Sequence, residues 1–127
     1  MSDLALDTNA VVAIQHRDPA AMQIASASSF ILPAPVLGEL YYGAMNSARA
    51  VQNIRALEQF ADTCTFASLN ASSCELYGGL RLTLRRAGTP IPYNDIWIAA
   101  ICLDLNVPLL TRDAHFDHVP GLQVVRW

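Results

Sequence analysis

The stretch Leu4-Ala5-Leu6-Asp7-Thr8-Asn9 near the start of the chain joins a short apolar run to three polar residues. A short apolar run bounded by turn-forming residues is typical of a buried strand, and the polar triplet marks where that strand should end. Acidic side chains are almost never fully buried without a partner. A strand that delivers Asp7 to its carboxyl end is therefore the starting point for predicting both fold and function.

Beyond this strand, apolar runs alternate with helix-like patterns along the whole chain. Strands are expected at Leu4–Leu6, Phe30–Leu32, Thr65–Ser68, Val107–Leu110 and Leu122–Val125. Helices are expected up to Ile14, then at Pro19–Ala27, Pro35–Ala44, Ser47–Asp62, Ser72–Leu84 and Asp95–Leu105. Such alternation implies a parallel sheet covered by helices on both faces. We predict an α/β fold, a three-layer α/β/α sandwich whose central, mostly parallel sheet has about four to five short strands.

Two local signals predict where the later helices begin and end. Ser72-x-x-Glu75 resembles a capping box, and the helix that it opens should stop at Gly88 and Pro90. Asn94 is a good cap for a helix that starts at Asp95.

Four acidic residues lie in otherwise apolar or small-residue segments: Asp7, Glu39, Asp95 and Asp113. Asp7 follows the first strand and Asp113 follows the strand at Val107–Leu110. Because binding crevices of such sheets lie beyond the carboxyl ends of the strands, both should point to one edge. Asp95 opens a helix, whose N-terminal dipole tolerates a carboxylate, and this end is placed to face the same crevice. Glu39 lies inside a helix beside its apolar stripe, and its convergence with the others is a hypothesis.

Carboxylates that share one cavity repel each other, since like charges about 4 Å apart cost about 4 kcal/mol at an effective dielectric of about 20. A divalent cation that prefers oxygen ligands removes this cost, which favours Mg²⁺, with Mn²⁺ as the alternative ion. We expect Asp7, Asp95 and Asp113 to hold the metal and Glu39 to bind a second ion or position a water. Because a metal held in this way activates water, all four are predicted catalytic residues in phosphodiester hydrolysis.

Each acid also has an ordinary structural interpretation. Asp7 suits a turn or helix cap, Asp95 a first-turn dipole residue, and Asp113 a loop acid paired with Arg112. The remaining acids resemble solvated surface residues or caps, and among them Asp117 is kept as an outer metal ligand. The conjunction of four acids favours the metal interpretation.

Short polar residues flank the acids and are expected either to orient the metal ligands or to cap turns: Thr8, Asn9, Asn94 and Thr111. His115 and His118 lie close to Asp113, but a zinc site is not favoured because cysteine and histidine ligands elsewhere are lacking.

Composition bounds the class of protein. The chain has 127 residues, of which 53% are hydrophobic and 15% charged, far from a disordered composition. We expect residues 1–127 to form a single domain. No apolar run approaches the ~20 residues of a membrane span, and the first residues lack a signal-peptide pattern. We therefore expect a cytoplasmic protein with no membrane partner.

The basic residues are unusual in kind and few in number. All eight are arginine, and the net charge is −3, so the footprint of a strong nucleic-acid binder is missing. The absence of lysine excludes a P-loop NTPase and Schiff-base chemistry. Arg81, Arg85 and Arg86 form one cluster, which is either a solvated helix face or a substrate-binding edge that grips phosphate, with Arg112 as a further contact.

The acidic segments, taken in order, resemble the PIN domain, in particular the VapC toxins of type II toxin–antitoxin pairs. The matching motifs are Leu6–Asn9, Glu39–Gly43, Arg85–Ile91 leading into Asn94–Ala100, and Leu110–Phe116 followed by Pro120–Leu122. This resemblance implies a PIN-like fold and a Mg²⁺-dependent endoribonuclease with Asp7, Glu39, Asp95 and Asp113 as its acidic constellation. It also implies a homodimer and a cognate VapB-like antitoxin whose tail blocks the pocket.

Two other classes of protein remain as alternatives. A metal-dependent phosphatase or phosphotransfer domain would also use an acidic pocket, but the chain lacks lysine and an Asp-x-Asp pair after its first strand. A non-catalytic module that binds RNA or a peptide would keep the pocket without cleaving, and only the arginine cluster supports it.

Overall fold

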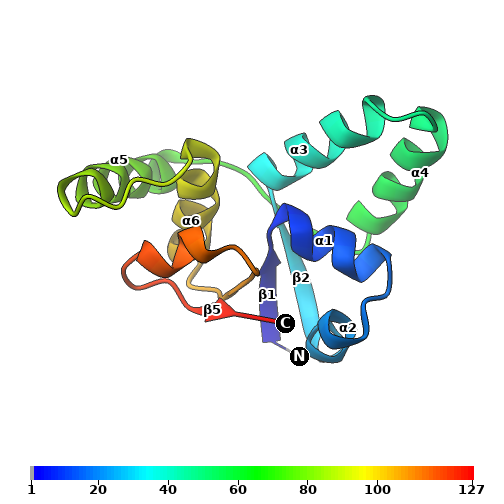
Figure 1. Cartoon of the computed structure of the whole chain (residues 1–127), viewed down its shortest axis with the longest axis horizontal. Coiled ribbons are helices and arrows are strands. Elements are labelled where there is room, and N and C mark those ends of the chain that lie inside the picture. Colours follow the sequence, from blue (N-terminus) through cyan, green and yellow to red (C-terminus); the bar gives the residue numbers. More distant parts are fainter. Residues whose placement is uncertain (1) are drawn as a thin grey trace.

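A computed structural model describes residues 2–127, and its helices and strands alternate along the chain (Figure 1). The elements in chain order are β1 (Ser2–Leu6), α1 (Thr8–Gln15), α2 (Pro19–Ala25), β2 (Ser28–Pro33), α3 (Ala34–Met45), α4 (Ala50–Ala61), β3 (Thr65–Ala67), α5 (Ala71–Arg86), α6 (Tyr93–Leu105), β4 (Leu109–Leu110), the 3₁₀ helix η1 (Ala114–His118) and β5 (Val124–Val125).

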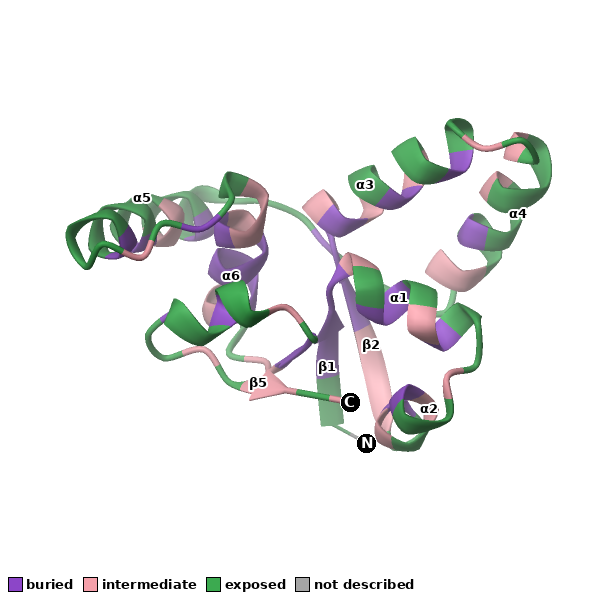
Figure 2. Ribbon diagram, in the orientation of Figure 1, coloured by how far each residue is buried: buried purple, intermediate pink, exposed green. Residues whose placement is uncertain are grey.

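The strands form one five-stranded sheet in the order β3-β2-β1-β4-β5, and every neighbouring pair is parallel. β1 lies in the middle, where Ala5 pairs with Ile31 of β2 and with Leu109 of β4. Leu4, Ala5 and Leu6 are all buried (Figure 2). An uninterrupted apolar run is what a strand covered on both faces requires, so the opening stretch of the sequence occupies the centre of the fold.

Helices cover both faces of the sheet. In Figure 1, α5 and α6 lie on one side of β1 and β2, and α1 to α4 lie on the other. Helix α5 packs against α6, while α3 packs against α4 and also contacts α1 and α6. This arrangement confirms the predicted three-layer sandwich, and the contact of α3 with α6 brings two layers together at the carboxyl edge of the sheet.

The ends of the later helices differ from the prediction in two places. The capping box of α5 joins Asn70 to Ser73: the Asn70 side chain accepts the Ser73 N–H at 2.9 Å, and Ser73 Oγ accepts the Asn70 N–H at 2.8 Å. The prediction of Ser72 and Glu75 was wrong because Asn70, an equally good cap, precedes them. At the other end, Gly88 adopts φ +73° just after α5, as a helix stop requires.

Helix α6 begins at Tyr93, so Asn94 is not its cap. The carbonyl of Pro92 already accepts the N–H groups of Asp95 and Ile96, at 3.0 and 3.2 Å. This closes the first turn before Asn94 can act as a cap, and its side chain is left for another role.

The late strands are shorter than expected. Pro108 has no N–H for the ladder, and β4 is confined to Leu109–Leu110 within the predicted Val107–Leu110. The 3₁₀ helix η1 was not predicted. In the part of the chain that the structure describes, none of the helices is long and apolar enough to span a membrane.

Candidate active site

The four predicted acids meet in one small pocket at the carboxyl ends of β1 and β4. The pocket has a volume of about 140 Å³ and is lined by Asp7, Thr8, Asn9, Glu39, Asp95, Ile98 and Asp113. These residues come from the ends of two strands, from α1, from the middle of α3 and from the first turns of α6. The sequence separations are long, so the topology of the sheet and the contact between α3 and α6 create the site.

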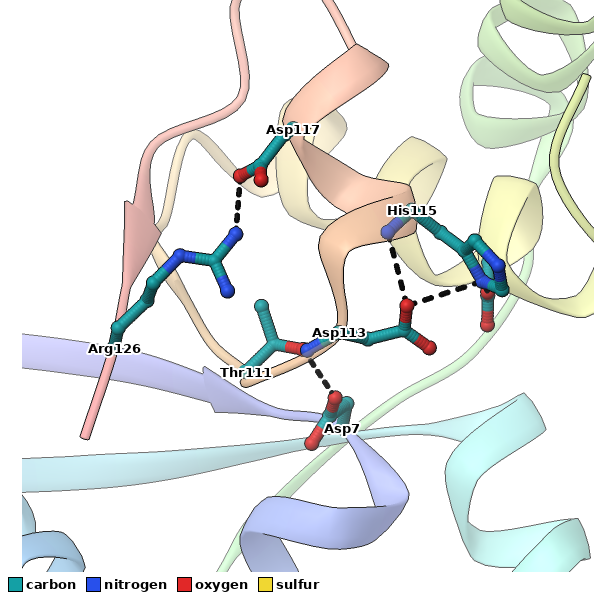
Figure 3. Close-up of polar contacts among 7 residues, drawn as sticks. Asp7, Thr111, Asp113, His115, Asp117 and Arg126 are labelled. Atoms are coloured by element: carbon teal, nitrogen blue, oxygen red, sulfur yellow. Dashed lines mark hydrogen bonds and ion pairs between the residues drawn. The ribbon is translucent and has the colours of Figure 1, made fainter. Parts of the chain in front are cut away.

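Asp7 lies deepest and is held by two elements (Figure 3). It is only 5% exposed. Its Oδ1 accepts the N–H of Ala10 at 2.8 Å, which caps α1, and its Oδ2 accepts the hydroxyl of buried Thr111. Thr111 Oγ1 in turn accepts the N–H of Asp113 at 2.9 Å. The cap interpretation of Asp7 and its position in the pocket are therefore both correct, and Thr111 links two of the acids.

Glu39 lies at the mouth of the pocket, where its carboxylate receives two side-chain donors. The Thr8 hydroxyl donates to Oε2 at 2.7 Å, and the Asn94 amide donates to Oε1. Thr8 opens α1 and Asn94 lies in the first turn of α6. Because helices from both faces of the sheet hold one exposed carboxylate, the side chain has a defined direction that its exposure alone would not give.

Asp95 and Asp113 both contact the same nitrogen of an imidazole ring. His115 Nδ1 is 3.0 Å from Asp95 Oδ2 and 3.1 Å from Asp113 Oδ1. Asp113 also caps η1, since its Oδ1 accepts the backbone N–H of His115 at 2.9 Å. One ligand atom from each of these three residues lies within 4.8 Å of the other two, close enough for a shared metal ion.

The pocket disfavours negative charge in the absence of a counterion. Burial raises the pKa of Asp7, and the nearby carboxylates of Asp113 and Asp95 add to this, against the lowering effect of the Thr111 and Ala10 hydrogen bonds. The pKa of Asp95 is also raised, chiefly by burial. Oxygen donors that are costly to ionise alone suit a hard divalent cation. The residues present therefore fit Mg²⁺ or Mn²⁺.

The predicted substrate-binding arginines lie outside this pocket. Arg81 and Arg85 line a separate cavity of about 530 Å³ beside the start of α6. The Arg81 guanidinium stacks 3.9 Å from the centre of the Tyr93 ring and donates to its hydroxyl at 2.8 Å. Arg86 is exposed and does not line the cavity.

Arg112 and Asp117 have partners of their own near the C-terminus. The Arg112 Nε donates to the Trp127 carbonyl at 3.1 Å, and its guanidinium lies 4.7 Å from the centre of the Trp127 ring. It does not pair with Asp113. Asp117 forms an ion pair with Arg126 (Figure 3) and does not line the pocket, so its interpretation as an outer metal ligand finds no support.

Sequence reasoning underrated two residues of the site. His115 was considered only as a zinc ligand, although its spacing from Asp113 across a short turn was a usable signal. Asn94 was expected either to orient a metal ligand or to cap a turn, and the partner that it binds, Glu39, depends on a contact between helices that no local pattern reveals.

Comparison with known proteins agrees with this geometry. The sequence pattern of the PIN domain matches residues 4–122. The chain is 34% identical to Ribonuclease VapC1 of Haemophilus influenzae (strain R2866), with 96% of each chain covered. Solved structures of VapBC-1 from nontypeable Haemophilus influenzae and of VapBC2 from Rickettsia felis bound to a promoter DNA fragment each superpose with a TM-score of 0.89. They are 29% and 28% identical, and 98% of each chain is covered. The chain thus belongs to the PIN domain family.

Proposed function

We propose that the chain is a Mg²⁺-dependent endoribonuclease and the toxin of a VapBC-type toxin–antitoxin pair, acting in the cytoplasm as a single PIN-like nuclease domain. The observation that carries this proposal is the convergence of four carboxylates from distant segments in one pocket. The similarity to VapC1, a named ribonuclease, supports RNA as the substrate.

Each acid of the pocket has a task in phosphodiester hydrolysis. Asp7, Asp95 and Asp113 would hold the cation, which supplies an activated water and neutralises charge on the phosphate. Thr111 fixes Asp7 and the start of the Asp113 turn. Glu39 is directed by Thr8 and Asn94, and in this orientation it would position the attacking water or a second ion.

The arginine cavity and the acid pocket are lined by different residues at the start of α6, which supports a role of the cavity in holding the RNA strand. Tyr93 and Ile96 line the cavity, whereas Asp95, between them in the first turn of α6, lines the pocket. A strand whose scissile phosphate lies at Asp95 can therefore place a neighbouring phosphate near Arg85. Arg81, Arg86 and Arg112 are proposed as weaker contacts, because Arg81 and Arg112 already stack on aromatic rings.

A groove on the α1, α3 and α4 side of the molecule supports the proposal that an antitoxin binds this chain. It has a volume of about 710 Å³, lies between α1, α3 and α4, and ends at Thr8 and Glu39 of the acid pocket. Its apolar lining includes Val12, Leu40 and Phe60. We propose that a VapB-like segment lies there and reaches the acids, which would block cleavage. A homodimer is also proposed, and light scattering at about twice 13.8 kDa would support it.

Cleavage of structured RNA tests the proposed activity directly. We expect cutting with Mg²⁺, none with EDTA, and a loss of about 100-fold or more in Asp7→Asn and Asp95→Asn, because each removes a charged metal ligand. Asp117→Asn is the matched control, since this acid lies outside the pocket.

Three outcomes would redirect the assignment. Full activity in Asp7→Asn or Asp95→Asn would remove the metal-site roles. Turnover of a small phosphoester without RNA cleavage would favour a phosphatase. Metal-independent RNA binding with no product would indicate a binding module.

A further inference from the structure

The contact of His115 with two acids is the feature of the site that an all-carboxylate metal centre does not require. Its Nδ1 is 3.0 Å from Asp95 Oδ2 and 3.1 Å from Asp113 Oδ1, and the ring is about half exposed (48%). In Figure 3 the Asp113 carboxylate points toward the imidazole, with Asp7 beyond it on the other side. The ring therefore lies at the outer edge of the acid pocket.

These distances are those of hydrogen-bonded groups in the metal-free protein, and they also match the spacing of neighbouring metal ligands. Two atoms that bind an ion at about 2.1 Å and at right angles to each other lie about 3.0 Å apart, as in the octahedral shell of a small divalent cation. We propose that His115 Nδ1 is a nitrogen ligand of the ion held by Asp95 and Asp113, and that it biases the site from Mg²⁺ toward Mn²⁺. This inference rests on the proposed metal-dependent function.

Orienting Asp113 does not by itself account for the ring. Asp113 is already fixed by the turn, because its Oδ1 accepts the backbone N–H of His115 at 2.9 Å and its own N–H donates to Thr111. Any residue except proline at position 115 would supply that backbone bond. The imidazole adds a ring nitrogen that hydrogen-bonds Asp95 Oδ2 in the metal-free protein and that lies beside two carboxylate oxygens, where it can also act as a metal ligand.

A nitrogen ligand changes which metal the site prefers. Carboxylate and water ligands suit Mg²⁺ and Mn²⁺ alike. Imidazole is a good ligand for later transition metals and a poor one for Mg²⁺. An imidazole ligand therefore raises the affinity of an oxygen-rich site for Mn²⁺ more than its affinity for Mg²⁺. Replacement of the ring should therefore weaken Mn²⁺ binding and leave Mg²⁺ binding nearly unchanged.

The experiment is Mn²⁺ titration of the full chain followed by electron paramagnetic resonance, at about pH 8 because neutral imidazole is the ligand form. His115→Gln is compared with wild type and with His118→Gln, a matched control three residues along in η1. We expect pulsed spectra to show nitrogen coupled to bound Mn²⁺ in wild type and in His118→Gln, and none in His115→Gln. Mn²⁺ affinity should fall about tenfold or more in His115→Gln, with less than about a twofold change in Mg²⁺ affinity measured by competition.

Three outcomes would overturn the proposal: no nitrogen coupling in wild type, coupling that survives His115→Gln, or an equal loss of both metals. The last would make the ring a positioning residue for the carboxylates. Because binding is read without RNA, these outcomes are separate from failure of the nuclease proposal, which is read as absent cleavage in a metal-loaded wild type.

Discussion

Asp7 combines a structural and a chemical task in one carboxylate. It caps α1 through Ala10, bonds Thr111, and faces the other acids while nearly buried. The capping bond needs only an oxygen acceptor, which asparagine also supplies. The charge itself is needed only for the cation, so substitution by asparagine separates the two tasks.

At the residue scale, Asp7→Asn should stabilise the metal-free protein. Removal of the charge removes the cost of burying it and the repulsion from Asp95 and Asp113, and these two effects raise the pKa of Asp7. We expect Tm in EDTA to rise by a few degrees, as about 1 kcal/mol gives in a domain of this size. Calorimetry in EDTA checks this, and a lower Tm than wild type would contradict it.

The same stabilisation should depend on pH. The pKa values of Asp7 and Asp95 are raised in the folded state, mainly by burial, so folding favours their protonated forms. Their contribution to stability is then fully present below the unfolded pKa of about 3.8 and is lost as pH rises through the folded values. Without metal, the Tm advantage of Asp7→Asn over wild type should therefore grow from about pH 4 to about pH 7.

Thermal unfolding in EDTA across this pH range measures that advantage. An advantage that stays constant would mean that the Asp7 carboxyl group has the same proton affinity in both states. Saturating Mg²⁺ should reverse the order of the two proteins at about pH 7, because only wild type keeps the full set of charged ligands.

At the scale of the elements, the order of strands and helices was readable because apolar periodicity is local. The strand at Leu4–Leu6 and the stop at Gly88 depend on neighbours within a few residues, and the structure confirms both. The caps were less predictable, since competing polar residues stand side by side. Asn70 rather than Ser72 caps α5, and the Pro92 carbonyl closes the first turn of α6 before Asn94 can act as its cap.

The position of the α5 cap is tested by comparing the stability of two variants. Asn70→Ala removes the side-chain acceptor for Ser73 N–H, together with an exposed 3.3 Å bond from the Asn70 amide to Asp104, and should lower the free energy of unfolding by about 1 kcal/mol. Ser72→Ala is the matched control, because Ser72 is exposed and takes no part in the capping box. Urea unfolding measures both. Equal destabilisation by the two changes would contradict Asn70 as the cap, and a larger loss in Ser72→Ala would place the cap at Ser72.

At the scale of the whole molecule, the site is a product of topology that the sequence shows only indirectly. Parallel strands explain why Asp7 and Asp113 share an edge. The position of Glu39 instead requires the contact between α3 and α6, and the His115 ring requires the unpredicted η1 turn. The first depends on packing between distant segments, which local patterns do not encode. The second is a short turn capped by Asp113, a local feature that the sequence analysis did not predict.

The charge of the whole molecule predicts weak, modestly salt-dependent RNA binding. The net charge is −3, and Arg112 and Arg126 are engaged with Trp127 and Asp117. If about three phosphates are contacted, log affinity for single-stranded RNA should fall against log salt with a slope of about −2. Fluorescence anisotropy with Asp95→Asn, which leaves the arginines intact, provides the measurement. A much steeper slope would indicate a further basic surface, such as one that dimerisation assembles.

The most direct test of a shared metal centre is anomalous diffraction from crystals soaked in Mn²⁺. We expect one strong peak or two adjacent peaks in the acid pocket, with carboxylate oxygens of Asp95 and Asp113 at about 2.1 Å. The absence of a peak beside the pocket acids in Mn²⁺-saturated crystals would contradict the claim that these carboxylates converge to bind a cation. A peak found elsewhere on the surface instead would contradict it as well.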